Sequence, residues 1–461
     1  MTLEPRAGES DQAPVMDAAE RLNRGCFCLS LDRPALMAAL DAEAGQPGFA
    51  AELATSHASL FSNVPVFVEA DSIDAMQAVV AAVEATARLP DYVAAAMRWA
   101  PPIARADSGP IGAMMGYDFH LTPAGPKLIE VNTNAGGAFL NAVLARAQRA
   151  CCVDRGILVD TGTAEADFGQ RIAAMFVSEW QRQRGSGEPM TIAIVDDDPS
   201  TQFLLPEFTL ARALLEQHGL ATIVVDAAAL DFDGTALSAA GRRIDLVYNR
   251  LVDFALAEER HAALHAAYAA GLVVVTPNPH VHALFADKRN LSLLSDPARL
   301  AQWGLATTHV DVLRAAVPPT VLVSAANAEA LWEQRRQLFF KPAGGHGSRA
   351  AYRGEKLTRK VWAEILAGDY VAQAFAAPGV RMIARDGVPT ELKIDVRLFT
   401  FEGAILLAAA RLYQGQTTNM RTPGGGFAPL FALPRAGNDP VSQRCCEAGG
   451  ENANLPKIGN D

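Results

Sequence analysis

Short apolar strands alternate with helices between about 188 and 286, and this alternation constrains the fold most strongly. TIAIV, ATIVV, IDLVYNR and GLVVVTP have the length and composition of buried strands, and LPEFTLARALLEQHG that of a helix. Strands separated by helices run parallel, because each helix returns the chain to the same edge of the sheet. We therefore predict a parallel α/β unit over 188–286.

Two further segments, far apart in the chain, have the pattern of β-hairpins. GAMMGYDFHL and KLIEVN flank the turn TPAGP, and ELKIDVRLFTF and AILLAAARLY flank a turn at Glu402–Gly403. Residues 1–100 are predicted to be mostly helical, with Asp32 as a helix N-cap. Beyond about 433 the apolar periodicity is lost, which predicts a disordered tail.

Length and charge narrow the classes of protein. A chain of 461 residues exceeds one hydrophobic core, so several packed units are expected. The net charge of −11 argues against nucleic-acid binding. No apolar run reaches the roughly 20 residues of a membrane span, and no secretory signal is evident, which predicts a cytoplasmic protein. The oligomeric state is left open.

The first hairpin carries a set of oxygen ligands. Asp118 lies in its first strand, and Glu130 and Asn132 lie two residues apart in its second. Residues two apart in a strand point to the same face, so two carboxylates and an amide oxygen are brought to one surface. Such hard oxygen ligands suit Mg²⁺. The alternative interpretation is an ordinary hairpin with a solvated polar face.

Two lysines lie beside short sequence motifs, one before a glycine-rich segment and one at a predicted helix start. Lys341 ends the strand FFKP and is followed by the glycine-rich segment 344–348, whose small residues allow backbone N–H groups to approach a phosphate. The segment matches neither a Walker loop nor a dinucleotide fingerprint, and the alternative is a glycine-rich turn. Lys288 opens a predicted helix at Asp287, which alone indicates only a charged helix start.

Together these segments resemble the ATP-grasp superfamily. A DK pair, a strand ending in KP, a glycine loop and a hinge strand follow one another in the family's order, whereas DFHL…LIEVNTNAGG, which resembles its magnesium motif, lies upstream. This order is similar to that of circularly permuted, glutathionylspermidine synthase-like members, and it implies that the two hairpins pair in one sheet. The chain departs from the family at His346, inside the glycine loop, and after Asn132, where Ala135–Gly136–Gly137 replace a common proline.

The resemblance implies an α+β ATP-grasp fold in circularly permuted order, with a pre-ATP-grasp-like parallel α/β unit and an N-terminal helical region. Its segments are expected at 1–100 (helical region), 101–187 (magnesium-motif part of the core), 188–286 (α/β unit), 287–375 (lid), 376–432 (rest of the core) and 433–461 (tail).

The same resemblance implies an ATP- and Mg²⁺-dependent ligase that joins a small-molecule or peptide carboxylate to an amine through an acyl phosphate. The alternatives are a small-molecule kinase and an inactive nucleotide-binding regulatory protein. The implied roles are metal binding by Asp118, Glu130 and Asn132, nucleotide binding by Lys288, Lys341, Gly344, Gly345, Gly347, Ser348, Gln373, Ala374 and Phe375, and catalysis by Arg397 and Arg411. Pairing with surface carboxylates is the alternative for the two arginines.

Weaker signals lie in the α/β unit. Asp196–Asp198 follow a strand and are interpreted as a solvated acidic loop rather than a site for a basic substrate. His261 and His265 share a helix face but lack the glutamate of a metalloprotease motif, so zinc is not predicted there. Arg250 and Asp253 are candidates for lining the acceptor site, and the polar loop 416–426 for covering it.

Overall fold

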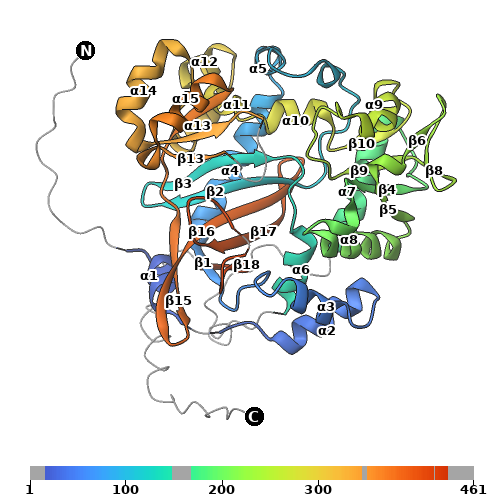
Figure 1. Cartoon of the computed structure of the whole chain (residues 1–461), viewed down its shortest axis with the longest axis horizontal. Coiled ribbons are helices and arrows are strands. Elements are labelled where there is room, and N and C mark those ends of the chain that lie inside the picture. Colours follow the sequence, from blue (N-terminus) through green and yellow to red (C-terminus); the bar gives the residue numbers. More distant parts are fainter. Residues whose placement is uncertain (1–15, 28, 148–167, 345–349, 420, 434–461) are drawn as a thin grey trace, which may run out of the picture.

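The computed structural model describes residues 16–27, 29–147, 168–344, 350–419 and 421–433. The described residues form four sheets, and α1 (Ala18–Gly25) lies at the edge of the molecule beside β15 (Figure 1). The predicted tail from 434 onward and the loop residues 345–349 lie outside the described residues. No helix in the described ranges is both long enough and apolar enough to span a bilayer.

A seven-stranded sheet forms the centre of the molecule. Its order is β1-β18-β17-β16-β2-β3, and β15 pairs with the extension of β16. The two predicted hairpins join as expected, because β16 runs antiparallel to β2 with Arg397 opposite Asp118. The strands are β1 (Val66–Glu69), β2 (Met115–Thr122), β3 (Gly125–Asn132), β15 (Gly379–Arg385), β16 (Val388–Phe401), β17 (Ala404–Tyr413) and β18 (Gly426–Leu433).

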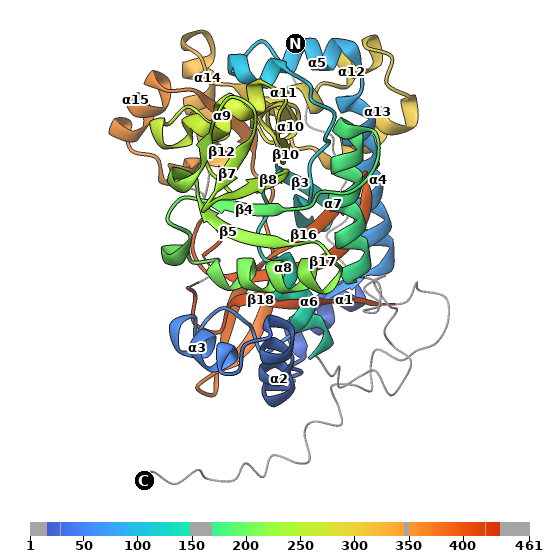
Figure 2. The same cartoon turned by 90° about the vertical axis from the view of Figure 1, so that its right-hand side faces the viewer.

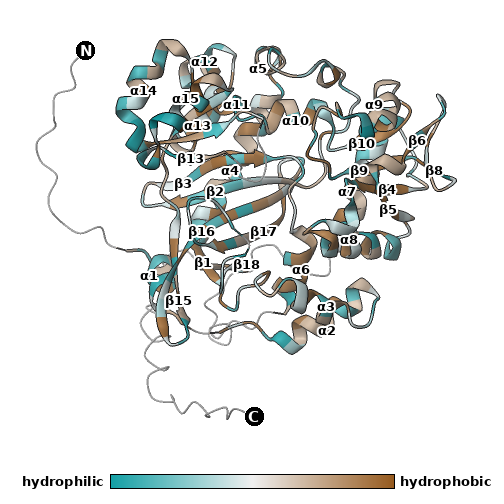
Figure 3. Ribbon diagram, viewed as in Figure 1, coloured by the Kyte–Doolittle hydropathy of each residue, from teal (hydrophilic) through white to brown (hydrophobic). Residues whose placement is uncertain are grey.

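Successive side chains of β2 and β16 point alternately to the two faces of the central sheet. Tyr117 and Leu398 point into a core shared with α4 (Ala70–Ala87) and α13 (Thr307–Ala316). Phe399 points the other way, into a core shared with α6 (Ala138–Arg146), α7 (Phe168–Arg184) and α8 (Leu205–Gln217). Asp118 lies between Tyr117 and Phe119 in sequence, so its side chain also leaves the first core. Figure 3 shows the apolar residues concentrated on the strands and on the helix faces turned toward them.

The predicted parallel sheet is present, in the order β10-β9-β4-β5 (Figure 2). Its strands are β4 (Ile192–Asp196), β5 (Thr222–Asp226), β9 (Leu246–Asn249) and β10 (Val274–Thr276), and α9 (Ala262–Ala269) lies between the last two in sequence. A small antiparallel sheet of β6 (Asp231–Phe232), β7 (Leu237–Ala239) and β8 (Arg242–Ile244) was not predicted, because its strands are too short to show a period.

The third sheet, which we call the lid sheet, has the order β11-β14-β12-β13 and contains the predicted strand FFKP and hinge strand. The helix predicted from Asp287 begins three residues later, at Asn290. The lid strands are β11 (Thr320–Leu322), β12 (Leu338–Pro342), β13 (Tyr352–Arg353) and β14 (Tyr370–Ala374). The accompanying helices are α10 (Pro279–Phe285), α11 (Asn290–Leu294), α12 (Pro297–Gln302), α14 (Ala328–Gln334) and α15 (Arg359–Ala367).

The N-terminal region is mostly helical, as predicted, but it also supplies β1, which completes the edge of the central sheet by pairing in parallel with β18. Asp32 caps its helix as predicted, accepting a hydrogen bond from the N–H of Ala35 at 3.0 Å. The helices of this region besides α1 and α4 are α2 (Arg33–Ala44), α3 (Phe49–Ser56) and α5 (Pro90–Ala96).

Candidate active site

A cavity of about 520 Å³ lies where the three sheets meet. Its lining includes the predicted metal ligands, both predicted lysines, the three hinge residues and both arginines. These residues are Asp118, Glu130, Asn132, Lys288, Lys341, Gln373, Ala374, Phe375, Arg397 and Arg411. Gly344 is described but does not line the cavity, and the predicted Gly345, Gly347 and Ser348 lie outside the described residues.

Asp118, Glu130 and Asn132 lie together at the junction of β2 and β3. Asp118 is directly opposite Glu130, and the register shifts immediately after Asp118. The Nδ2 atom of Asn132 donates to Asp118 Oδ2 at 3.1 Å and to Glu130 Oε1 at 3.3 Å. The shift has the form of a β-bulge, an irregularity that often redirects side chains next to functional sites.

Both predicted arginines bind Asp118. Arg397 donates from Nε to Oδ1 at 2.5 Å and from Nη2 to Oδ2 at 2.7 Å, the bidentate geometry that guanidinium groups form with carboxylates. Arg411 Nη2 lies 2.9 Å from Asp118 Oδ2 and 3.3 Å from Asp395 Oδ2. Asp118 and Asp395 are 3% and 4% exposed, so the partners of these arginines are buried in the site and not on the surface.

The two lysines approach the site from the lid side. Lys341 Nζ donates to the carbonyl of Ile129 at 2.8 Å and to Gln373 Oε1 at 2.9 Å, and thereby ties β12 and β14 to β3. Lys288 Nζ lies 3.9 Å from Glu130 Oε2. Burial lowers the pKa of Lys341 to about 8, with Lys288 acting in the same direction against the attraction of Glu130.

The pKa of Glu130 reflects the excess of positive charge around it. Burial alone raises the pKa of this carboxyl group, but Lys288, Lys341 and Arg411 outweigh burial and lower it to about 2. Glu130 is therefore ionised at neutral pH, which is the form that binds a cation.

Sequence reasoning missed a second buried carboxylate, Asp395. It accepts hydrogen bonds from Tyr413 at 3.0 Å and from Thr418, and its Oδ1 lies 2.9 Å from His120 Nε2. Burial raises the pKa of Asp395, but His120 and Arg411 outweigh it and hold the pKa well below its usual value. The available signal was the period of two, because Asp395 precedes Arg397 by two residues on the same face of β16.

The parallel sheet supplies the opposite end of the cavity. Asp196 ends β4 and Arg250 follows β9, at the carboxyl edge where open α/β sheets bind ligands. Arg250 Nη1 lies 3.4 Å from the carbonyl oxygen of Ala135, and its buried Nε has no hydrogen-bond partner among the described residues. Burial raises the pKa of Asp196 to about 6. Asp196 and Arg250 thus present opposite charges to the same space.

The interpretation of Asp196–Asp198 as a solvated loop is wrong for its first two residues. Asp196 is only 8% exposed, and Asp197 Oδ1 lies 2.9 Å from His261 Nε2. Asp253, a candidate for the acceptor site, does not line the cavity but lies 2.8 Å from His261 Nδ1. These contacts arise because the strand ends bring three loops together, which the linear sequence does not show.

His261 belongs to this polar cluster and not to a pair with His265, whose Nδ1 lies 3.0 Å from the carbonyl of Leu256. Asp197, Glu258 and His261 have ligand atoms within 4.8 Å of one another, as a metal site requires. Arg260 Nε lies 3.0 Å from Asp197, however, and supplies the positive charge there. We therefore assign no metal to this cluster.

The residues around the cavity fit Mg²⁺ and a nucleotide in most respects. Two carboxylates and an amide provide hard oxygen atoms, and the buried Nε2 of Gln373 has no partner among the described residues. In the hinge, two backbone N–H groups already have partners. The N–H of Ala374 donates to Pro319 and that of Phe375 to Gln337, both at 2.8 Å, so an adenine contact would use the carbonyl groups there.

Comparison with solved structures places this geometry in a known fold. The chain is similar to a glutathione synthetase-like effector from Globodera pallida in its apo form, with 12% identity and a TM-score of 0.51 over 88% of this chain and 98% of that one. It also matches a putative gamma-glutamylcysteine synthetase from Methylobacillus flagellatus, with 10% identity and a TM-score of 0.44 over 78% and 87% of the two chains.

A third match is the ATP-grasp ligase PsnB complexed with minimal precursor, Mg and ADP, with 15% identity and a TM-score of 0.23 over 56% of this chain and 96% of that one. No family model and no curated protein matches the chain. The first likeness, which covers 88% of this chain and 98% of the other, shows that this α+β chain shares the fold of that glutathione synthetase-like effector.

Proposed function

We propose that this protein is an ATP- and Mg²⁺-dependent ligase that joins a carboxylate to an amine through an acyl phosphate. The observation that carries the proposal is the convergence, in one cavity, of the Asp118–Glu130–Asn132 oxygen ligands with two lysines and two arginines. An acidic set suits a divalent cation, and the surrounding cations suit the phosphates that such a cation accompanies.

We assign a role to each group of residues from its position in the cavity. Asp118, Glu130 and Asn132 would hold Mg²⁺, which neutralises phosphate charge during transfer. Lys288 and Lys341, which reach the cavity from the lid side, would contact the phosphates of ATP. We further propose that the described Gly344 and the segment 345–348 cover the phosphates, and that Gln373 to Phe375 border the adenine.

Arg397 and Arg411 would bind the γ-phosphate and then the acyl phosphate. The guanidinium group of Arg397 already binds the Asp118 carboxylate in the bidentate manner that also suits phosphate, and Arg411 Nη2 lies close to Asp118 and Asp395. The substrate carboxylate would attack the γ-phosphorus, releasing ADP, and the amine would then displace phosphate from the acyl group. Most of this chemistry requires positioning and charge stabilisation and no protein nucleophile.

The end of the cavity formed by Asp196 and Arg250 would hold the substrate. The unpaired Nε of Arg250 suits a carboxylate, and the Asp196 carboxylate suits an ammonium group. A small-molecule or peptide carboxylate that also carries an amine is therefore the class to test first.

The chain order supports a further proposal, that this is a circularly permuted ATP-grasp protein. The β2–β3 hairpin with the metal ligands precedes the lid sheet in sequence, whereas β16 and β17, which pair beside it, follow the lid. The units proposed at 101–187, 188–286, 287–375 and 376–432 correspond to this order.

The experiment follows ADP release with hydroxylamine as a general amine. Carboxylates are incubated with ATP, Mg²⁺ and the protein, and acyl hydroxamate is measured beside ADP. Amine-dependent ADP release with a stoichiometric hydroxamate supports the ligase, whereas ADP release with a stable phosphorylated product would establish the kinase alternative. If the folded protein bound no non-hydrolysable ATP analogue at millimolar concentration, both the ligase and the kinase function would be refuted.

Two Arg→Lys variants, one inside the cavity and one outside it, provide a matched test of the proposed phosphate contact. Arg397→Lys keeps the charge but cannot make both hydrogen bonds to a planar anion, and should lower kcat by about 10²–10³-fold. Arg299→Lys, at an exposed ion pair on α12, is the control and should leave turnover unchanged.

A further inference from the structure

We propose that the carboxylate substrate carries an apolar side group and that Phe203 determines the size of group accepted. The group would lie against an apolar wall formed by Phe203, Leu204, Phe208, Val252 and Phe254, all of which line the cavity. This inference rests on the proposed ligase function and adds to it the chemical class of the substrate's side group.

The apolar wall begins directly beside the proposed reacting centre. Arg397 Nη1 lies 3.4 Å from the carbonyl oxygen of Gly136. A Cβ atom at Gly136 would collide with Leu204 Cδ1 and would lie 3.3 Å from Arg250 Nη2. Gly136 is thus bordered by Arg397, proposed to bind the acyl phosphate, by Arg250, proposed to bind the substrate carboxylate, and by Leu204 of the wall. A substrate whose carboxylate lies between those arginines has its nearest substituents next to Leu204.

The wall continues on both sides of Arg250. Phe203 and Leu204 lie in the loop between β4 and α8, and Val252 and Phe254 lie in the segment after β9. The Val252 side chain is 43% exposed, and Phe254 stacks on His282 with ring centroids 3.5 Å apart. The five apolar side chains of the wall line the same cavity as Asp196 and Arg250. A fully polar substrate would leave them without an apolar group to contact.

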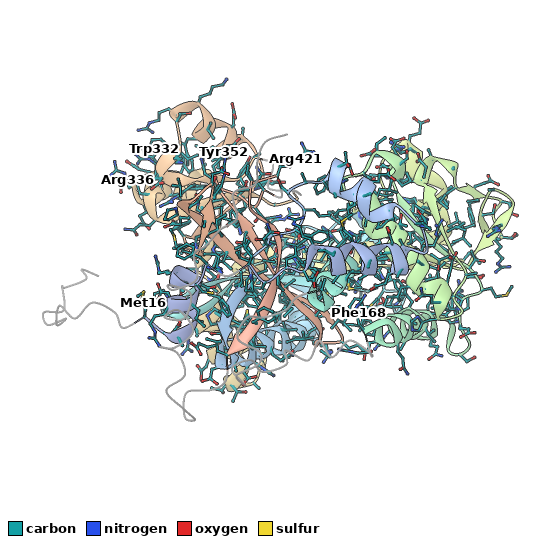
Figure 4. All side chains as sticks on the ribbon, turned by 90° about the horizontal axis from the view of Figure 1, so that it is seen from below. Met16, Phe168, Trp332, Arg336, Tyr352 and Arg421 are labelled. Atoms are coloured by element: carbon teal, nitrogen blue, oxygen red, sulfur yellow. The ribbon has the colours of Figure 1, made fainter. Side chains whose placement is uncertain are left out.

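Phe203 is held in place by two neighbours from distant parts of the chain. Its ring lies 4.5 Å from that of His57, centroid to centroid, and His57 Nε2 lies 2.9 Å from its carbonyl oxygen. The guanidinium of Arg421 lies 5.7 Å from the Phe203 ring centroid, in the region between the lid and the parallel sheet (Figure 4). These contacts fix the aromatic ring, so it can act as a rigid limit to the subsite.

The same contacts give the N-terminal region a role. His57 is the C-cap residue of α3, and its contact with Phe203 joins that helix to the loop that lines the cavity. His57 is therefore a positioning residue in this proposal, acting on the substrate only through Phe203.

The test compares amino acids as acyl donors, because each supplies an ammonium group for Asp196 and differs only in its side chain. Glycine, alanine, glutamate, leucine and phenylalanine are assayed with ATP, Mg²⁺ and hydroxylamine. Since each methylene in an apolar pocket changes specificity by about 10-fold or more, kcat/KM for leucine should exceed that for alanine by at least about 10-fold. Glycine or glutamate reacting as well as leucine would overturn the inference while leaving the ligase function intact.

Variants of the wall separate specificity from folding. Phe203→Ala should lower kcat/KM for leucine by about 10-fold or more and change that for glycine little, because glycine reaches no part of the wall. The phenylalanine-to-leucine ratio should rise in this variant, because the larger side group gains the space that the ring occupied. His57→Ala should act in the same direction and less strongly, and Phe203→Leu should restore the preference. Phe49→Ala removes the same ring from the same apolar core outside the cavity and should leave the leucine-to-glycine ratio unchanged.

Binding decides the matter if no donor releases ADP, an outcome that would count against the ligase function itself. Leucine and glycine are then titrated calorimetrically into the protein with Mg²⁺ and a non-hydrolysable ATP analogue. Tighter binding of leucine, lost in Phe203→Ala, supports the apolar subsite. Equal binding of the two, or an equal loss of both in the variant, refutes it.

Discussion

Replacing Glu130 by glutamine removes one negative charge from among three cations and should destabilise the ligand-free protein. Lys288 Nζ lies 3.9 Å from Glu130 Oε2, and Lys341 and Arg411 act on the same carboxylate. Without the carboxylate these three cations repel one another across a largely buried space. Glu130→Gln preserves the size of the side chain, so the change isolates charge.

The structure gives the size of this effect by two routes. A unit charge pair about 4 Å apart contributes about 4 kcal/mol at an effective dielectric constant of about 20. The depression of the Glu130 pKa from 4.5 to about 2 corresponds to about 3 kcal/mol. The Glu130 side chain is 28% exposed, so we take the lower figure. With 461 residues and about 2 cal/mol/K of unfolding entropy per residue, about 3 kcal/mol lowers the melting midpoint by about 3 °C.

The pH dependence makes the prediction specific. Because the pKa of Glu130 is depressed in the folded state, its contribution is complete above pH 4.5 and is lost as the pH falls from 4.5 toward 2. Melting is therefore followed at pH 7 and at several values below 4.5, for wild type, Glu130→Gln and the control Glu364→Gln on exposed α15. A variant as stable as wild type at pH 7, or a difference that persists undiminished in acid, would refute the reasoning.

Three further predictions concern the same cavity and its supports. Nucleotide affinity should fall as the pH rises through about 8, because Lys341 then loses its charge; calorimetry at pH 7 and 9 should show this fall in wild type but not in Lys341→Met. Glu207→Gln should destabilise by about 1–3 kcal/mol, measured by thermal melting, because the Glu207 carboxylate accepts N–H bonds from Gly137, Phe139 and Leu140 at the start of α6. Mn²⁺ should bind about 10-fold or more tightly in the presence of an ATP analogue than alone, as measured by electron paramagnetic resonance. The reason is that two arginines occupy Asp118 until phosphate competes for them. Equal affinity in both conditions would contradict this.

The sequence predicted the elements whose pattern is local and long. The strands of the parallel sheet and both long hairpins have clear periods, and the proximity of Asp118, Glu130 and Asn132 follows from spacing within one hairpin. The pairing of the two hairpins was also expected, from the resemblance to permuted ATP-grasp proteins.

Elements that depend on distant partners could not be predicted in this way. β1 is a four-residue strand whose pairing with β18, more than 350 residues later, is invisible to any window of sequence. Asp395 lies in a strand that reads as mostly apolar, and only the arrival of His120 and Arg411 from other strands makes it part of the site. Phe203 belongs to a loop whose position is set by the parallel sheet and by its contact with His57 of α3.

The charge balance of the cavity explains why metal and nucleotide should bind together. The described lining of the cavity carries seven lysines and arginines and four carboxylates, which leaves an excess of three positive charges before the histidines are counted. A cation alone would increase that excess and would compete with two arginines for Asp118. An anionic phosphate chain reverses both effects, because it neutralises the lysines and offers the arginines a second partner. In the proposed reaction Asp118 would then be free to bind the metal, so the ion pairs of the ligand-free site would hold these charged groups in place until metal and nucleotide bind together.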